Sequence, residues 1–276
     1  MLKLMYITSN SDVARIVENA GVDRIFIDME YIGKDIRQGG MDTVQNHCTV
    51  EDVRRIRKVI SKAQLMVRVN PIHDAAREYD SSEKEIEAVI AAGADLIMLP
   101  YFQTAKELER FIKIVDGRAR VFPLLESKKA LENIDEILEV PGIDEIHIGL
   151  NDLSLELKKK FMFELLADGT VEMLCEKFRK KGIPYGYGGI GRLGKGDLPA
   201  EYIIKEHYRL GSTCAILSRS FCNTNIITEL DQIKKIFEVG LKEIRNLEKE
   251  CMEAQNYFEE NKRMVQEKIK EIAGIR

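Results

Sequence analysis

The chain repeats one local pattern, in which a helical stretch ends at a glycine turn and a short apolar run follows. Glycine suits the end of a helix because it tolerates positive φ. The apolar runs lack polar alternation, as expected for buried parallel strands. The pattern occurs in residues 20–28, 92–100, 141–149, 181–189 and 210–218, and similar apolar runs occupy residues 3–8, 64–70 and 120–126.

Eight such strands alternating with helices predict an α/β fold, the (β/α)8 TIM barrel. The length of 276 residues is usual for one such barrel or for two small domains. The alternative fold is an open, doubly wound sheet. Capping boxes mark several of the expected helix starts: Thr49 with Asp52, Ser82 with Glu85, and Thr104 with Glu107.

The last part of the chain departs from the repeat. Residues 229–276 consist almost entirely of helix-forming residues. Apolar residues recur there near helical spacing: Ile233, Ile236, Phe237, Val239, Leu241, Ile244 and Leu247. We therefore predict a barrel in residues 1–228 and a C-terminal helical extension in residues 229–276, part of which packs on a neighbouring subunit. The alternative is a solvated helical tail.

Composition and charge exclude several classes of protein. The chain is 45% hydrophobic and 32% charged, with a formal net charge of −4 and no basic stripe, so nucleic acid is not an expected partner. Its apolar runs are strand-sized, so no membrane span is expected. The scattered cysteines contain no CxxC pair, and the first residues lack the apolar core of a signal peptide. These features predict a cytoplasmic protein with reduced thiols.

Two acids stand at the ends of successive apolar strands. Glu126 ends the run 121–126, and Asp152 ends the run 146–152. The carboxyl ends of neighbouring parallel strands lie side by side, so the two carboxylates would form a site for a hard divalent cation. Asp152 has a second interpretation, as the cap of a helix that starts at Leu153.

The other strand ends add charged groups to the same mouth. Asp28 and Glu30 follow the second strand, and Arg68 follows the third. An arginine fork recognises a planar carboxylate at two points, and a cation beside it can polarise a carbonyl or stabilise an enolate. Together they predict a site for an α-keto acid. Asp28 could instead be a structural acid paired with Arg68 or Lys128, and Arg68 could only bridge to an acid. Further polar residues follow the strands: Asn70, Tyr101, Gln103, Asn151, Ser218 and Arg219.

Two loops are candidates for the rim of the site. Residues 31–48 form a long polar loop after the second strand. This loop contains His47, which, with His73, could reach the mouth as an acid or base. His147 is expected in the barrel interior. Gly189-x-Gly191-x-x-Gly194 matches a dinucleotide fingerprint by letters, but it follows the seventh strand, and the next helix starts near Pro199. A tight loop near the site is the favoured interpretation.

A resemblance to a known family rests on a set of short segments in a fixed order: FIDMEY (26–31), MVRVNP (66–71), AGADLIMLPYFQTAKE (92–107), PLLES (123–127) and IHIGLNDLS (146–154). They are similar to the HpcH/HpaI aldolase and citrate lyase β-subunit family of phosphoenolpyruvate/pyruvate-binding barrels. The resemblance implies Mg²⁺ or Mn²⁺ held by Glu126 and Asp152, and Arg68 on the carboxylate or enolate oxygen of the substrate. It also implies substrate contacts to the turn Gly149–Asp152, which contains Asn151, and a homo-oligomer, often a trimer or hexamer.

One position departs from the aldolases that the chain resembles. They have a histidine directly after the glutamate of the strand-two motif, and here that position is Tyr31. Tyr31 and His47 are the candidate replacements for that acid or base. The resulting hypothesis is a metal-dependent carbon–carbon lyase that acts through a pyruvate-type enolate. The alternatives are a phosphoenolpyruvate mutase or phosphonate-type enzyme on the same barrel, and a catalytically silent barrel that serves as a binding or assembly module.

Overall fold

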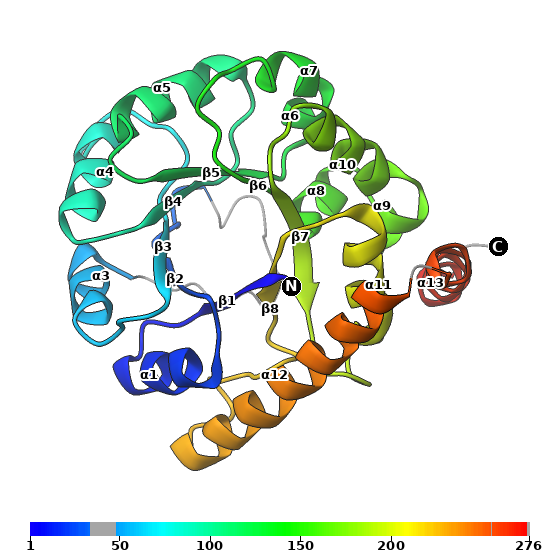
Figure 1. Ribbon diagram of the computed structural model, residues 1–276. Helices are drawn as coiled ribbons and strands as arrows, with labels where there is room; N and C mark the ends of the chain where they lie inside the picture. Colours follow the sequence, from blue (N-terminus) through cyan, green and yellow to red (C-terminus); the bar gives the residue numbers. More distant parts are fainter. Residues whose placement is uncertain (34–47, 255, 275–276) are drawn as a thin grey trace.

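Eight parallel strands close into a barrel in the computed structural model, which describes residues 1–33, 48–254 and 256–274 (Figure 1). Each strand pairs with the next along the chain, and β8 pairs with β1. The predicted (β/α)8 barrel is confirmed, and the open doubly wound alternative is wrong. The strands are β1 (Lys3–Ile7), β2 (Arg24–Asp28), β3 (Gln64–Arg68), β4 (Leu96–Leu99), β5 (Arg120–Leu125), β6 (Ile146–Ile148), β7 (Tyr185–Ile190) and β8 (Cys214–Leu217).

Helices surround the barrel on the outside (Figure 1). They are α1 (Ser11–Ala20), α3 (Val50–Arg57), α4 (Ser82–Ala91), α5 (Ala105–Val115), α6 (Lys128–Glu132), α7 (Ile134–Ile137), α8 (Leu150–Glu156), α9 (Glu164–Ala167), α10 (Thr170–Lys180), α11 (Ala200–Leu210), α12 (Leu230–Glu253) and α13 (Phe258–Ala273). Among the residues described, no helix is both long enough and apolar enough to cross a membrane.

The barrel has two apolar cores. The larger one lies between the strands and the outer helices. The smaller one fills the barrel interior with Met5, Phe26, Met66, Leu96, Met98, Phe122, Leu124 and Cys214. His147 is buried beside this inner core, with its ring centroid 5.9 Å from that of Phe122. The expectation that His147 lies in the barrel interior is therefore confirmed.

A buried ion cluster closes the amino-terminal end of the barrel. Arg24 is fully buried, and its Nη2 lies 2.6 Å from Oε1 of Glu145, which precedes β6. Arg120 and Lys3 also contact Glu145, at 2.8 Å and 3.5 Å. Because this end is filled by paired charges, the opposite end, where catalytic groups of such barrels lie, is the one open to chemistry.

Local sequence signals explain most helix starts. Thr49 and Thr104 form capping boxes with Asp52 and Glu107, as predicted. The predicted box of Ser82 with Glu85 is wrong, because α4 has Ser81 as its N-cap. The Glu85 side chain instead accepts hydrogen bonds from Asn70, which follows β3. A residue that looks like a helix cap in the sequence is thus part of the mouth of the barrel.

Close contact between strands requires glycine at one position of β7. A Cβ on Gly186 would lie 2.3 Å from the backbone oxygen of Cys214 in β8. A side chain at that position would push the two strands apart. The register between β7 and β8 also shifts close by, between Gly186 and Gly189. Gly186 within β7 therefore serves barrel closure.

The C-terminal helices have two different positions. α12 lies against α1 and α11 as part of the outer ring (Figure 1). Most of the predicted apolar stripe is buried there, on the barrel of the same chain, whereas Val239 is 49% exposed. α13 packs outside α11 and α9, where Asn261 Nδ2 donates to Glu206 at 2.8 Å. Residues 230–253 therefore cover the barrel itself, and α13 alone forms an additional layer.

Phe237→Ala should destabilise the protein by about 3–5 kcal/mol, because a fully buried aromatic side chain would leave a cavity against Tyr6 and Phe221. Val239→Ala, on the exposed face of the same helix, should change the free energy of unfolding by less than about 0.5 kcal/mol. Urea unfolding followed by circular dichroism measures both. Equal midpoints for the two variants would show that α12 does not contribute to the core.

Candidate functional site

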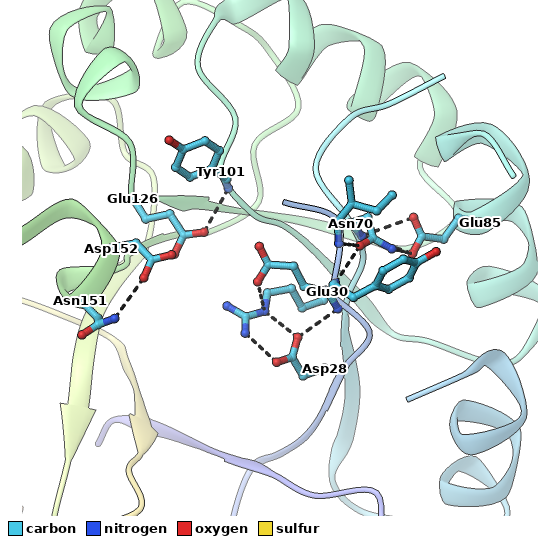
Figure 2. A network of polar contacts seen from close by, with 11 residues as sticks. Asp28, Glu30, Asn70, Glu85, Tyr101, Glu126, Asn151 and Asp152 are labelled. Carbon is cyan, nitrogen blue, oxygen red and sulfur yellow. Dashed lines mark hydrogen bonds and ion pairs between the residues drawn. The ribbon is translucent and has the colours of Figure 1, made fainter. Parts of the chain in front are cut away.

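Glu126 and Asp152 point toward each other at the carboxyl end of the barrel (Figure 2). Glu126 directly follows β5, and Asp152 lies in the first turn of α8, just after β6. Both side chains are buried, with residue exposures of 4% and 6%. The alternative role of Asp152 as a helix cap is wrong, since α8 already begins at Leu150. The barrel thus brings together the two acids singled out from the sequence.

Neighbouring backbone and side-chain N–H groups hold these two carboxylates in place. The N–H of Tyr101 donates to Oε1 of Glu126 at 3.1 Å, and Asn151 Nδ2 donates to Oδ1 of Asp152 at 3.0 Å. A Cβ on Gly149 would lie 2.7 Å from Glu126 Oε2, so only glycine leaves room for this carboxylate. The N–H of Gly149 itself donates to Leu125 O at 2.9 Å. Gly149 therefore contributes space to the site, and its amide is already used within the barrel.

A second charged group stands beside this pair. Arg68 Nε and Nη2 donate to the two carboxylate oxygens of Asp28 at 2.8 Å and 2.7 Å, and Glu30 Oε2 lies 3.4 Å from Nε. Burial on its own would lower the pKa of Arg68, but the carboxylates of Asp28 and Glu30 raise it well above the ordinary value. Arg68 is therefore a permanent cation at the mouth, as the sequence predicted.

The pairing with Asp28 changes what Arg68 can offer to a ligand. Its Nε and Nη2 edge is taken by Asp28. Within the described part of the chain, Nη1 makes no hydrogen bond, and the side chain of Arg68 is 15% exposed. A guanidinium has five N–H donors, so the Nη1 and Nη2 end can still bind a carboxylate. Asp28 orients the guanidinium for that use, which fits the structural role that the sequence left open for it.

Asn70 fixes the start of the loop after β2. Its Oδ1 accepts hydrogen bonds from the N–H groups of Tyr31 and Ile32, both at 2.9 Å, and its Nδ2 donates to Glu85 at 2.8 Å (Figure 2). Burial raises the pKa of Glu85, although the bonds from Asn70 oppose that change. Burial, together with the nearby Glu85 carboxylate, also raises the pKa of Tyr31. A smaller fraction of Tyr31 is therefore ionised at neutral pH than of an ordinary tyrosine, so little of it is present in the form that can accept a proton.

The oxygen ligands at the mouth suit a divalent cation. Asp28, Glu30, Glu126 and Asp152 are all at least nine-tenths buried, and Arg68 lies near Asp28, Glu30 and Glu126. In the ranges that the structure describes, no three His, Cys, Asp or Glu side chains form a metal-binding group. Mg²⁺ commonly binds through only one or two carboxylates and keeps several waters. Glu126 and Asp152 fit that mode of binding.

The described histidines have structural roles, and His47 stays a candidate for the acid or base. His47 lies outside the described residues. Both ring nitrogens of His73 contact backbone oxygens, of Pro71 at 2.7 Å and of Asp80 at 2.9 Å, so this ring holds its own loop together. Burial lowers the pKa of His147 and of His207 to about 3, which keeps both rings neutral. His207 stacks on Tyr187, with ring centroids 3.9 Å apart.

The loop with the dinucleotide-like letters has another structural role. It follows β7, and α11 begins only at Ala200, so no helix opens directly from the glycines. A Cβ on Gly191 would lie 2.8 Å from the hydroxyl of Ser220, after β8. The loop is thus packed tightly against its neighbour at the rim, as the favoured interpretation expected.

Sequence reasoning missed the groups that orient the charged residues. Asn70 and Tyr101 follow strands and could be seen as mouth residues, but their partners could not. Glu85 and Glu156 lie on helices, far along the chain from the residues that they bind. A short-range pattern carries no signal for such contacts.

Curated relatives match parts of the chain. A 2-keto-3-deoxy-L-rhamnonate aldolase of Escherichia coli is 28% identical over 115 residues, covering 31% of this chain and 43% of that enzyme. A pyruvate kinase of Methylorubrum extorquens is 36% identical over 73 residues, covering 26% of this chain and 15% of the kinase. The chain therefore spans less than half the length of these two relatives.

Solved structures agree over most of the chain. An HpcH/HpaI aldolase from Desulfitobacterium hafniense superposes with a TM-score of 0.57 at 16% identity, covering 84% of this chain and 93% of that one. An HpcH/HpaI aldolase/citrate lyase family protein from Burkholderia cenocepacia gives a TM-score of 0.62 at 14% identity, covering 84% and 94%. These likenesses show the fold.

The sequence profile of one family spans the site described above. It matches residues 3–165, from β1 into α9, which is more than half of the chain and includes Asp28, Arg68, Glu126 and Asp152. The protein belongs to the HpcH/HpaI aldolase/citrate lyase family.

Proposed function

We propose that the protein is a divalent-metal-dependent carbon–carbon lyase that makes or consumes a pyruvate-type enolate. The observation that carries this proposal is the buried pair Glu126 and Asp152, with the Arg68 guanidinium close enough to Glu126 to interact with it electrostatically. Family membership supports the class of reaction, and the partial match to an aldolase supports a keto acid as substrate.

Each charged group has one part in this proposal. Glu126 and Asp152 would hold Mg²⁺ or Mn²⁺, with waters and substrate oxygens in the remaining positions. When bound, the cation polarises the keto group and stabilises negative charge on its oxygen. Arg68 uses its Nη1 and Nη2 end for a substrate oxygen, while Asp28 fixes the plane of the guanidinium.

The proposed substrate is an α-keto acid with a hydroxyl group on the carbon chain, such as a 2-keto-3-deoxy sugar acid. In cleavage, a base removes the hydroxyl proton, the carbon–carbon bond breaks, and the products are an aldehyde and the pyruvate enolate. His47 and Tyr31 are the candidates for that base. The raised pKa of Tyr31 favours His47, whose ordinary pKa is near 6.5.

We further propose that the protein acts in the cytoplasm as a homo-oligomer. The support for self-association is the exposure of two apolar residues just before and at the start of α12, with Ile226 77% and Leu230 41% exposed. Light scattering should therefore give a mass of several chains, and Ile226→Glu should lower it. A monomeric mass for the unaltered protein would remove this part of the proposal.

Enolate formation can be measured without knowing the aldehyde. With Mn²⁺ present, the enzyme should exchange the methyl protons of pyruvate for deuterium in heavy water, as followed by NMR. Arg68→Lys keeps the charge but loses the planar fork. We expect it to slow exchange by about 30- to 1,000-fold, which corresponds to about 2–4 kcal/mol of lost stabilisation.

Arg118→Lys is the matched control, because Arg118 makes a similar two-point contact with Glu87 on the outer surface. It should exchange pyruvate at the unaltered rate. If the unaltered enzyme with Mn²⁺ gives no exchange above the metal alone, the proposed reaction is wrong. If Arg68→Lys exchanges the protons of pyruvate at the rate of the unaltered enzyme, Arg68 has only a structural role.

The acid/base assignment needs two reactions. His47→Ala should slow cleavage of 2-keto-3-deoxy sugar acids by about 100-fold or more, since a positioned base contributes on the order of 10²–10⁴. Decarboxylation of oxaloacetate needs no such base, so it should persist in both His47→Ala and Tyr31→Phe. Unchanged cleavage by His47→Ala, together with lost cleavage by Tyr31→Phe, would assign the proton transfer to the phenol or a water bound to it.

A further inference from the structure

Tyr101 has an unusual backbone conformation beside the candidate metal ligands. It follows β4 by two residues, and its φ of 47° lies in the left-handed region that bulky side chains seldom occupy. Such a conformation persists only where surrounding contacts impose it, and residues of this kind gather at functional sites. The contacts of Tyr101 therefore show what the strained backbone serves.

Tyr101 contacts two acids with its two ends. Its backbone N–H donates to Oε1 of Glu126 at 3.1 Å, and its phenol hydroxyl donates to Oε1 of Glu156. The other oxygen of Glu156 accepts the N–H of Lys128, two residues after Glu126, at 2.5 Å. Glu156 thus contacts the segment after β4 through Tyr101 and the segment just after Glu126 through Lys128.

Glu156 also shares a helix with the second candidate ligand. Asp152 and Glu156 are four residues apart in α8, so they lie on the same face of that helix. One short helix therefore presents Asp152 to the site and Glu156 to the residues that hold Glu126. A further bond, from Ser127 Oγ to Phe102 O at 2.9 Å, ties the segments after β4 and β5 together.

We propose that Tyr101 and Glu156 are positioning residues that fix the carboxylate of Glu126 relative to that of Asp152 and so set the affinity for the divalent cation. This inference rests on the proposed function, because it assumes that Glu126 and Asp152 bind the cation. The hydroxyl of Tyr101 holds its backbone in the left-handed conformation, and that conformation aims its N–H at Glu126. Outer groups that orient metal ligands typically change metal affinity by about 10- to 100-fold when removed.

The test is calorimetric titration of the full-length protein with Mn²⁺, without substrate. Tyr101→Phe and Glu156→Ala should each weaken Mn²⁺ binding by about 10- to 100-fold. The double variant should bind no more weakly than the weaker single variant, because both changes break the same tether. Measuring two different single variants guards against a folding defect in either one, and circular dichroism checks that each is folded.

Tyr208→Phe is the matched control. The Tyr208 hydroxyl donates to Glu248 at 3.0 Å, and Glu248 also accepts the N–H of Leu2, at the opposite end of the barrel. This variant loses the same kind of hydrogen bond, so it should lower the melting temperature and leave Mn²⁺ affinity unchanged. Equal Mn²⁺ affinity in the unaltered protein, Tyr101→Phe and Glu156→Ala would overturn the positioning role alone. Absence of Mn²⁺ binding by the unaltered protein would overturn the metal site and the positioning role with it.

Discussion

Like charges held together out of water dominate this structure. Four carboxylates from the ends of β2, β5 and β6 are buried at one mouth, and the guanidinium of Arg68 lies beside two of them, Asp28 and Glu30. Burying an ionised carboxylate is costly unless it is paired and hydrogen-bonded. Arg68 pairs with Asp28 and Glu30, whereas backbone and amide N–H groups support Glu126 and Asp152. Carboxylate oxygens are the ligands that a divalent cation such as Mg²⁺ prefers, which is why we place the proposed cation between the last two.

The closed barrel makes this arrangement possible. Its hydrogen bonds run around the ring from β1 to β8 without an edge, so the strand ends are rigid supports. The two ends of the barrel have different tasks. The amino-terminal end is filled by the pair Arg24 and Glu145, where burial would raise the pKa of Glu145 but the hydrogen bonds from Arg24 lower it. The other end carries groups that are held by neighbours but still face a ligand.

Much of the fold and of the candidate site could be predicted from the sequence, for definite physical reasons. The barrel follows from the repeated apolar runs, and the position of Glu126 and Asp152 follows from the rule that parallel strands end at the same edge. The sequence indicates the pairing of Arg68 with Asp28 only as an alternative, because a position at the end of a strand does not show which partner the guanidinium contacts. Glu85 was misassigned to a capping box, since its real partner, Asn70, is close only after folding. Glu156 gave no signal at all, because it looks like one of many acids on an outer helix. The stripe in α12 was correctly seen as apolar, but the sequence could not say that most of it covers the chain's own barrel.

In the proposed reaction, Glu126 and Asp152 together hold one divalent cation that in turn receives the keto acid. Crystals soaked with Mn²⁺ and oxalate, an enolate-like dianion, test this arrangement through anomalous difference density at the manganese edge. We predict one strong peak between the two carboxylates, with oxalate lying between that peak and the Nη1 and Nη2 end of Arg68. A peak elsewhere, or oxalate bound by Arg68 with no manganese between Glu126 and Asp152, would contradict it.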